Sequence, residues 1–445
     1  MTRSRSWGTV SLFCCLGTAL SACSFISGGR EVDHRVHEGE VPAHSVPTSV
    51  SEVAWEWRTP EEYGSLQEVL PDRAGPVMVM GRGVAGLDGA TGQELWHYRV
   101  EDGGVRRVWT TPGGQDVLLG VPGGEDEPDT MVLLDAGTGE LIAEHDTDLE
   151  GGTVHTAAVT SHVGVLVSQE RDMVEGFSLR DGEHAWTYEL PDRAGSAGVA
   201  HEEVVRAGET VVVMATYYDH TLEDESVRQY DQVMFAAALD GETGEPLWEL
   251  EQEFAYDMLL DVESEVSPSK EALFLGVRAG AEYDLLVDPA TGGEIGGAAY
   301  QDRERYPVGL LDDGYVETAV DYDEGTVGYW HMSFEGEELA CLETRSRPGE
   351  DGIGRGLLLE EGVLRPDHLT GPDLDRGPVD VEFARWNSED EPLVLNADMT
   401  VNEEWWFESE GSVTTLPDSP VLALVPGAVV VTEENPGPWT VVGLT

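Results

Sequence analysis

The stretch Val84-Ala85-Gly86-Leu87-Asp88-Gly89-Ala90-Thr91-Gly92-Gln93-Glu94-Leu95-Trp96 contains a pattern that recurs along the chain: an apolar run, an Asp-x-x-Thr-Gly turn and a second apolar run. An Asp side chain at the start of a turn accepts a backbone N–H two residues further on, and Gly adopts the positive φ that closes a hairpin. The pattern therefore predicts β-hairpins. Four full copies of the turn are present: Asp88, Thr91 and Gly92; Asp135, Thr138 and Gly139; Asp240, Thr243 and Gly244; Asp288, Thr291 and Gly292.

The turns are spaced as the blades of a β-propeller are. A shortened copy lies at residues 179–186 and a degraded copy at 334–340, so the closing glycines stand at 92, 139, 182, 244, 292 and 336. Successive glycines are 47, 43, 62, 48 and 44 residues apart. A period of about 40–50 residues with short strands is typical of one four-stranded blade. Because no stretch has a sustained helical period, the sequence predicts an all-β propeller.

The two ends of the chain predict how the ring closes. Residues 441–445 match the strand that precedes the turn at Asp88, and residues 52–57 match the strand that follows it. One blade is therefore shared between the N-terminal and C-terminal strands, which hides edges that would otherwise be exposed. The residues after Gly336 leave room for two more blades. We expect eight blades, with seven blades and one large insertion as the alternative.

The repeat resembles the PQQ-like, or quinoprotein-type, propeller repeat over residues 51–445. In that family the Trp after each turn packs between neighbouring blades, so the resemblance implies blade-docking roles for Trp96, Trp186 and Trp248. The corresponding positions of two other copies hold Ala143 and Gly296, which cannot dock in this way.

The same family includes quinone-dependent dehydrogenases that commonly carry an adjacent Cys pair and a set of calcium ligands. The only adjacent cysteines here are Cys14 and Cys15, at the extreme N-terminus. No residue of this sequence can be identified as a ligand of the quinone, so we expect no enzymatic activity, no cofactor and no bound metal. Acidic loops at residues 124–129 and 321–324 are expected to be solvated rather than calcium-binding.

The N-terminus predicts export and a lipid anchor. Arg3 and Arg5 precede an apolar run that ends at Leu20, which is too short to span a bilayer. The run continues into Leu20-Ser21-Ala22-Cys23, which resembles the lipobox of bacterial lipoproteins. The resemblance implies that residues 1–22 are a signal peptide and that the Cys23 thiol is acylated, for example with palmitate. A plain secretory signal with an accidental Cys is the alternative.

The residues between the anchor and the propeller have few apolar side chains. Residues 23–50 are expected to be a flexible tether, and 51–445 the propeller. Within the tether, Asp33, His34, His37 and His44 lack the spacing of a closed zinc site and are interpreted as linker residues. Cys341 lies in an apolar run and is expected to be a small buried side chain.

The charge excludes some classes of partner. The 445 residues contain 25 Lys+Arg and 87 Asp+Glu, a net charge of −62. Nucleic acids and anionic lipid surfaces are bound through basic patches, so such an acidic protein is not expected to bind either of them.

We therefore predict a membrane-anchored, extracytoplasmic lipoprotein whose propeller is a non-enzymatic protein-binding scaffold in the cell envelope. Its layout is similar to that of BamB-type outer-membrane-assembly lipoproteins. The predicted partners are the lipid bilayer, through acylated Cys23, and another cell-envelope protein. A quinone-dependent oxidoreductase and a sensor of small ligands or cations in the central channel are the alternatives.

Overall fold

The computed structural model describes most of the chain from Cys23 to the C-terminus. The described residues are 23–27, 30–101, 103–123, 128–147, 154–168, 173–191, 198–219, 230–256, 262–277, 285–295, 305–321, 326–345, 356–366, 379–388, 390–397, 421–432 and 440–445. They form strands almost exclusively, with two short 3-10 helices, η1 (Glu61–Tyr63) and η2 (Pro112–Gly114). No described helix has the length and hydropathy needed to cross a membrane.

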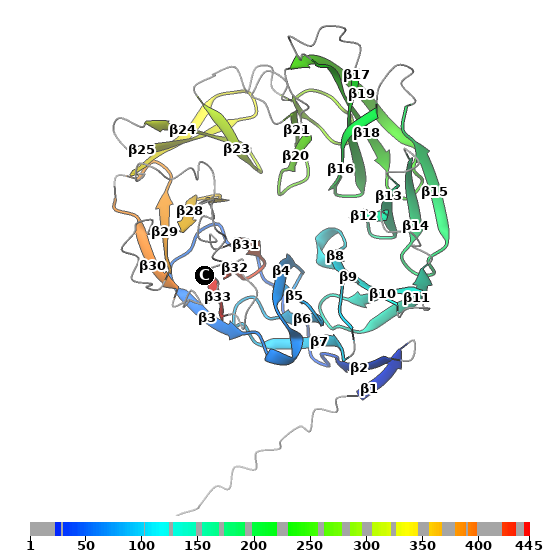
Figure 1. Ribbon diagram of the computed structural model, residues 1–445. Coiled ribbons are helices and arrows are strands. Elements are labelled where there is room, and N and C mark those ends of the chain that lie inside the picture. The colour runs from blue at the N-terminus through cyan, green and yellow to red at the C-terminus, as the bar shows by residue number, and fades with distance from the viewer. Residues whose placement is uncertain are drawn as a thin grey trace, which may run out of the picture.

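Eight antiparallel sheets are arranged radially around a central axis, so the predicted eight-bladed propeller is confirmed (Figure 1). Blades 1 to 4 contain β4 (Leu66–Pro71), β5 (Pro76–Met80), β6 (Gly83–Leu87) and β7 (Glu94–Val100); β8 (Arg107–Thr110), β9 (Asp116–Val121), β10 (Asp129–Asp135) and β11 (Leu141–Thr147); β12 (Val154–Val159), β13 (Val163–Ser168), β14 (Met173–Ser178) and β15 (His184–Glu189); and β16 (Gly198–Ala207), β17 (Thr210–Asp219), β18 (Tyr230–Asp240) and β19 (Pro246–Tyr256).

The second half of the ring is less regular. Blade 5 has three named strands, and an isolated bridge between Val287 and Glu294 marks the place of a fourth. Blades 5 to 8 contain β20 (Val262–Val266), β21 (Leu273–Val277) and β22 (Leu285–Val287); β23 (Tyr306–Leu311), β24 (Gly314–Asp321), β25 (Thr326–Ser333) and β26 (Glu338–Arg345); β27 (Leu357–Leu359), β28 (Gly362–Pro366), β29 (Val379–Arg385) and β30 (Leu393–Ala397); and β31 (Val421–Val425), β32 (Ala428–Thr432), β33 (Thr440–Leu444) and β3 (Val53–Arg58).

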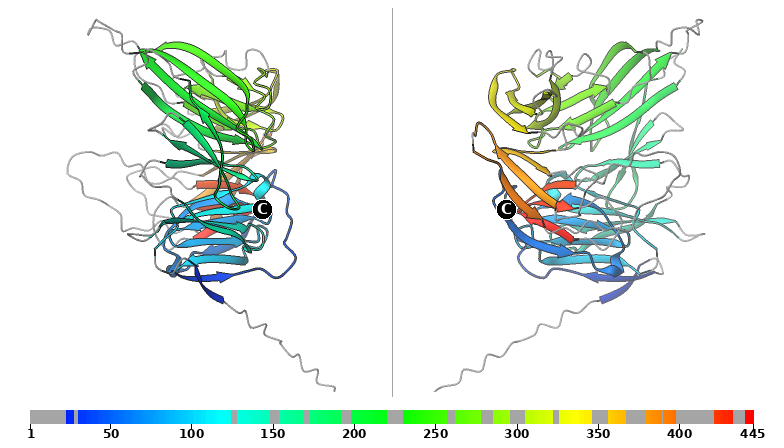
Figure 2. Two further views of the ribbon diagram at one scale, coloured as in Figure 1. Left: turned by 90° about the vertical axis from the view of Figure 1, so that its right-hand side faces the viewer. Right: turned by 60° about the vertical axis from the view of Figure 1, so that its left-hand side comes forward.

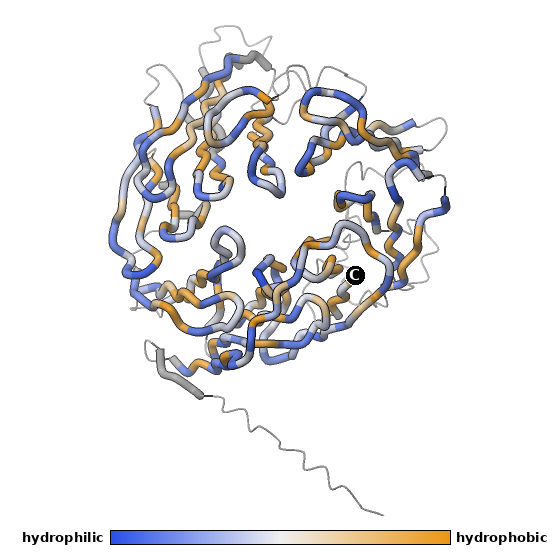
Figure 3. The backbone as a smooth tube through the Cα atoms, turned by 180° about the vertical axis from the view of Figure 1, so that it is seen from behind, coloured by the Kyte–Doolittle hydropathy of each residue, from blue (hydrophilic) through white to orange (hydrophobic). Residues whose placement is uncertain are grey.

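The core lies between the blades. A middle strand is covered on both faces by the neighbouring blades, so it is apolar throughout rather than alternating. In β5, β6 and β32 every residue is buried. Figure 3 shows the apolar segments of the backbone inside the blades and the hydrophilic ones at the turns. Each inter-blade cluster joins side chains from two blades, as Val77 and Val79 of blade 1 pack with Val117 and Leu119 of blade 2.

The ring closes by pairing the two ends of the chain, as the sequence predicted. Strand β3 pairs antiparallel with β33, and Trp55 lies opposite Gly443. The backbone N–H of Ser51 donates to the carbonyl of Thr445 at 2.6 Å, which extends the pairing to the last residue. Without β3, the edge of β33 would be unpaired.

Residues 30–50 differ from the predicted flexible tether, because they lie against the propeller. Strand β2 (Arg30–Arg35) pairs antiparallel with the outer strand β7, and β1 (Cys23–Ser27) pairs with β2, so the sheet of blade 1 has six strands. By the two-residue alternation of a strand, Val32 and His34 point inward and are buried. We call residues 30–50 the N-terminal strap.

Beyond β2 the strap runs along one face of the disc (Figure 2). It crosses the turns of blades 2, 1, 8 and 7 in that order before β3 begins. His37 N–H donates to the carbonyl of Thr138 at 2.9 Å, and His44 lies 3.5 Å from Asp88. The N–H groups of Gly427 and Glu361 donate to the carbonyls of Ser45 and Thr48 at 2.9 and 3.0 Å. Val50, at the end of the strap, is buried among residues of blades 7 and 8.

Candidate functional site

The predicted turn residues form one local structure at each copy. Asp88 Oδ1 accepts from the N–H groups of Ala90 and Thr91 at 3.0 and 2.9 Å, and Gly92 has a φ of +66°. The carboxylates of Asp135 and Asp240 likewise accept from the N–H and the hydroxyl of the Thr three residues on. In the fourth copy Asp288 accepts from Ala290 N–H and from the Thr291 hydroxyl. These residues build turns.

The tryptophans that follow the turns lie at the joints between blades. Trp96 is fully buried, and its Nε1–H donates to the carbonyl of Ala136 in the turn of blade 2 at 2.6 Å. Its ring lies so close to Gly139 that a Cβ there would meet it at 2.8 Å. The same contact recurs from blade 3 to blade 4, from blade 4 to blade 5 and from blade 8 to blade 1: Trp186 to Gly241, Trp248 to Pro289, and Trp55 to Gly89.

Two joints use other side chains where Trp is missing. His145, two residues after Ala143, lies against Gly182 of the blade 3 turn. Burial lowers the pKa of His145, so its ring packs there in the neutral form. Between blades 6 and 7, Asn387 has a φ of +54°, and its side-chain oxygen accepts from the N–H of Cys341 at 3.1 Å. The repeat signature did not include either residue.

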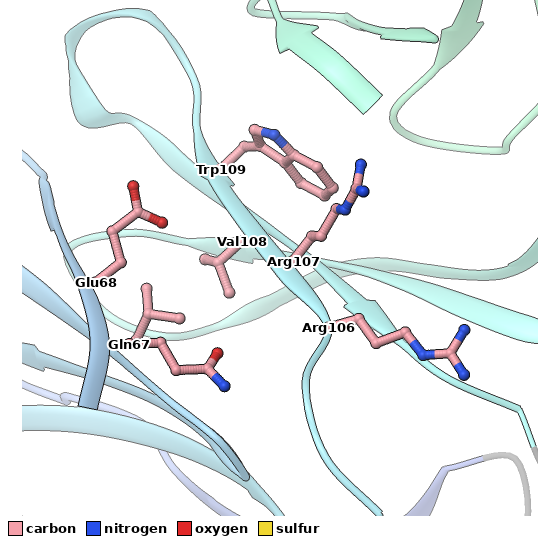
Figure 4. A pocket seen from close by; sticks show the side chains of 7 residues that line it. Gln67, Glu68, Arg106, Arg107, Val108 and Trp109 are labelled. Atoms are coloured by element: carbon pink, nitrogen blue, oxygen red, sulfur yellow. The ribbon is translucent and has the colours of Figure 1, made fainter. Parts of the chain in front are cut away.

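A pocket of about 310 Å³ lies between the innermost strands of blades 1 and 2, β4 and β8 (Figure 4). Buried Val79 and Val108 form its apolar part. Glu68 of β4 lies on one wall, and Val108 of β8 on the other (Figure 4). It is lined by Gln67, Glu68, Val79, Arg106, Arg107, Val108 and Trp109.

Arg107 and Trp109 border the pocket, but they alternate with Val108 along β8, so their side chains point to the other side of the strand (Figure 4), where Trp109 packs against an apolar cluster that joins blades 2 and 3. Arg106 is 70% exposed and lies 3.6 Å from Asp129, so solvent screens this ion pair. Desolvation raises the pKa of Glu68 on the opposite wall. The arrangement can accept a small group that offers an apolar surface to Val79 and Val108 and a carboxylate to Arg106. Sequence analysis missed this site, because none of its residues belongs to the repeated turn.

The strap is attached to blade 1 by charged contacts as well as by strand pairing. Arg35 Nη2 donates to Glu94 Oε1 at 2.7 Å, and Arg99 Nη2 donates to Asp33 Oδ2 at 2.9 Å. Burial opposes ionisation of Asp33, but the hydrogen bonds and charges of Arg99 and His97 together outweigh it and lower the pKa of Asp33. His34 Nε2 lies 2.6 Å from the carbonyl of Gly139, and burial lowers the pKa of this His.

The four residues that invited a metal interpretation therefore serve separate contacts. Asp33 bonds Arg99, His34 contacts Gly139, His37 Nε2 lies 3.3 Å from the carbonyl of Glu40, and His44 lies beside Asp88. No group of three or more potential metal-ligating side chains occurs within the described part of the chain. The acidic loops at 124–129 and 321–324 lie largely outside the described residues.

The two cysteines of interest are both in strands. Cys23 is the first residue of β1, and the predicted signal peptide, residues 1–22, lies outside the described residues. Cys341 was expected to be buried but is exposed. Its neighbours Ala340 and Leu342 are buried, so the alternation of β26 turns Cys341 to the outside.

The fold and its repeated joints define an eight-bladed β-propeller whose repeats resemble PQQ-like repeats. Residues 80–264, which run from the end of β5 into β20, match the family described as outer membrane protein assembly factor BamB. No curated protein matches the chain in sequence.

Several solved propellers are similar to the chain at low identity. BamB from Moraxella catarrhalis is 14% identical, with a TM-score of 0.45; the similarity covers 89% of this chain and 100% of that one. The Dos1 propeller is 10% identical, with a TM-score of 0.45 and coverages of 88% and 94%. The quinohemoprotein alcohol dehydrogenase ADHIIG from Pseudomonas putida HK5 is 12% identical, with a TM-score of 0.38 and coverages of 88% and 75%.

Proposed function

We propose that the protein is an extracytoplasmic lipoprotein, acylated at Cys23, whose propeller binds other proteins of the cell envelope without catalysing a reaction. The family match over residues 80–264 to an outer membrane assembly factor supports this class of function. The lipobox-like Leu20–Cys23 supports the anchor. Two acyl chains bind a bilayer stably, whereas one is marginal.

The observation that carries the proposal is the pairing of β2 with β7. The rim of blade 1 holds an extended segment of polypeptide through strand pairing, buried Val32 and the ion pair between Arg35 and Glu94. Extended peptides commonly bind proteins by adding a strand to a sheet edge, with side chains giving specificity. This pairing supports the proposal that the rim of the propeller holds extended segments of other proteins in the same way.

The same pairing constrains the anchor. Cys23 precedes Arg30 by seven residues, a span of at most about 25 Å when extended. An acyl group on Cys23 would hold blade 1 close to the bilayer. The other blades would then face the extracytoplasmic compartment. A scaffold with a fixed attachment point presents its surfaces in a defined orientation.

The proposal of a protein without turnover rests on where the repeat residues are used. The Asp-x-x-Thr-Gly turns and the tryptophans form joints, so a repeat signature reports the fold and not a reaction. The adjacent cysteines that quinone enzymes of this type carry stand here only at Cys14 and Cys15, within the predicted signal peptide.

Affinity purification tests the proposal. The full-length, lipidated protein is purified from solubilised membranes and compared with Cys23→Ser. The parent should fractionate with membranes, carry acyl mass and co-purify with a protein in fixed stoichiometry. The Cys23→Ser protein should be uncleaved or leave the membrane fraction. Acyl mass on the Cys23→Ser protein would refute the anchor, and the absence of a stoichiometric protein partner would refute the scaffold.

The pocket between blades 1 and 2 favours a second function, recognition of a small carboxylate-bearing ligand. It combines the exposed Arg106 with an apolar floor formed by Val79 and Val108. Native mass spectrometry of the purified protein tests this. A bound small molecule that is lost in Arg106→Ala would support the second function, and a mass equal to that of the acylated polypeptide alone would contradict it.

A further inference from the structure

The outer edge of blade 4 differs from the other outer edges of the ring. Its last strand, β19 (Pro246–Tyr256), has 11 residues, whereas β7, β11, β15, β26 and β30 have between five and eight. Strand β19 ends its sheet, and no described strand pairs with its outer side. Native proteins usually keep such edges short, because unpaired backbone groups recruit other strands.

The edge of β19 is also regular. From Trp248 to Tyr256 its residues pair one-to-one with those of β18, and the only register shift lies at the turn, between Ala238 and Leu239. Bulges and prolines are two common ways of blocking an edge. In β19 the only proline is Pro246, at the first position. The backbone groups along the strand are therefore presented in the geometry that a further antiparallel strand requires.

The side chains that flank this edge are acidic. Leu247 is 47% exposed, and Glu249, Glu251 and Glu253 follow it at alternate positions and are exposed too. Glu249 accepts a hydrogen bond from the Tyr188 hydroxyl of blade 3 at 2.8 Å, which fixes one carboxylate beside the edge. Opposite charges directly across a strand pair are favourable, and like charges are unfavourable. The three carboxylates of Glu249, Glu251 and Glu253 therefore repel a second copy of β19 and favour a strand with basic side chains.

The chain itself shows how such an edge is occupied. On blade 1 the edge strand β7 is covered by β2, and Arg35 of the added strand donates to Glu94 of the edge at 2.7 Å. Leu95 of β7 is 8% exposed, whereas Leu247, at the corresponding position three residues after the turn glycine of blade 4, is 47% exposed. Blade 4 therefore has the exposed leucine and the carboxylates without the added strand.

We propose that the outer edge of blade 4 binds an extended, arginine- or lysine-containing segment of a partner protein, which adds to β19 as an antiparallel strand. The inference rests on the proposed scaffold function and names the surface and the chemistry of its partner. The partner's backbone pairs with β19, an apolar side chain covers Leu247, and basic side chains lie beside Glu251 and Glu253.

The test uses the purified full chain and a ten-residue peptide that alternates Arg and Val and is blocked at both ends. A second peptide of the same sequence carries N-methyl groups on alternate residues, which keep its charge and remove backbone donors. Affinity is measured at about 0.15 M salt, and hydrogen exchange locates the bound peptide. We expect the first peptide to bind and to slow exchange within residues 247–253. The N-methylated peptide should bind at least about tenfold more weakly.

Matched variants separate this edge from the general acidity of the protein. Glu251→Lys with Glu253→Lys should weaken binding by about tenfold or more, and the neutral pair Glu251→Gln with Glu253→Gln should weaken it less. Glu335→Lys with Glu338→Lys makes the same change of charge at exposed residues of blade 6 and should leave the affinity nearly unchanged. Circular dichroism confirms that each variant is folded.

Several outcomes would overturn the proposal. Equal binding of both peptides would show that charge alone acts, and protection at another blade would place the site elsewhere. Sedimentation that shows a dimer broken by Glu251→Lys with Glu253→Lys would assign the edge to a second copy of the chain. A membrane partner that co-purifies equally with that variant and with the parent would leave the scaffold function standing and refute the role of β19.

Discussion

Replacement of Trp96 by Ala should remove a large part of the stability of the propeller. Trp96 is 0% exposed, lies between Gly86 and Gly139, and donates to the carbonyl of Ala136. Loss of a buried Trp side chain costs about 3–5 kcal/mol. The unpaired carbonyl of Ala136 adds about 1 kcal/mol. The total is a substantial fraction of the roughly 5–15 kcal/mol that stabilises a typical domain.

The assay is urea unfolding followed by circular dichroism, with Trp248→Ala and Leu247→Ala as comparisons. Trp248 makes the same kind of contact but is only partly buried, so its loss should lower the free energy of unfolding less than the loss of Trp96. Leu247 is 47% exposed, and its replacement should change stability by about 0.5 kcal/mol or less. If Trp96→Ala cost no more than Leu247→Ala, the inter-blade joints would not hold the ring together.

Three further predictions concern the closing blade, the strap and the anchor. Deletion of residues 51–58, which removes β3 with buried Trp55, should lower the melting temperature of the whole domain; a shift of no more than a degree or two would contradict closure through β3. The pKa of His34 is lowered in the folded state, so the unfolded chain binds more protons and stability should fall as the pH drops below about 6.5. His34→Gln should flatten that dependence in thermal melts between pH 7.5 and 5.5, and an unchanged slope would refute the role of His34. Metabolic labelling with a radioactive or clickable palmitate should mark the parent and not Cys23→Ala, and equal labelling would place the acyl chain elsewhere.

The ring and its closure were predictable because the relevant signals are local and repeated. Each Asp-x-x-Thr-Gly turn fixes a hairpin by its own hydrogen bonds, and the match of residues 441–445 and 52–57 to the two sides of such a turn gives the split blade. The exposure of Cys341 was also within reach, because buried Ala340 and Leu342 leave it on the opposite face of β26. The error came from reading an apolar run without its alternation.

The strap and the pocket depend on contacts between distant parts of the chain. The β2 sequence Arg-Glu-Val-Asp-His-Arg is polar and short. It becomes a strand because Val32 is buried against blade 1, and because Asp33 and Arg35 form hydrogen bonds with Arg99 and Glu94 respectively. The pocket joins residues 67–68 to residues 106–109, which meet only when blades 1 and 2 pack side by side. Neither the strap nor the pocket residues have a sequence pattern from which these contacts could be predicted.

The central claim, that this propeller is not a quinone-dependent enzyme, is tested most directly by titrating the purified chain with pyrroloquinoline quinone and calcium. The absorbance of the quinone and the reduction of a dye by alcohols or sugars are recorded together. We expect neither quinone binding nor substrate-dependent dye reduction. Stoichiometric quinone binding with turnover would contradict this claim.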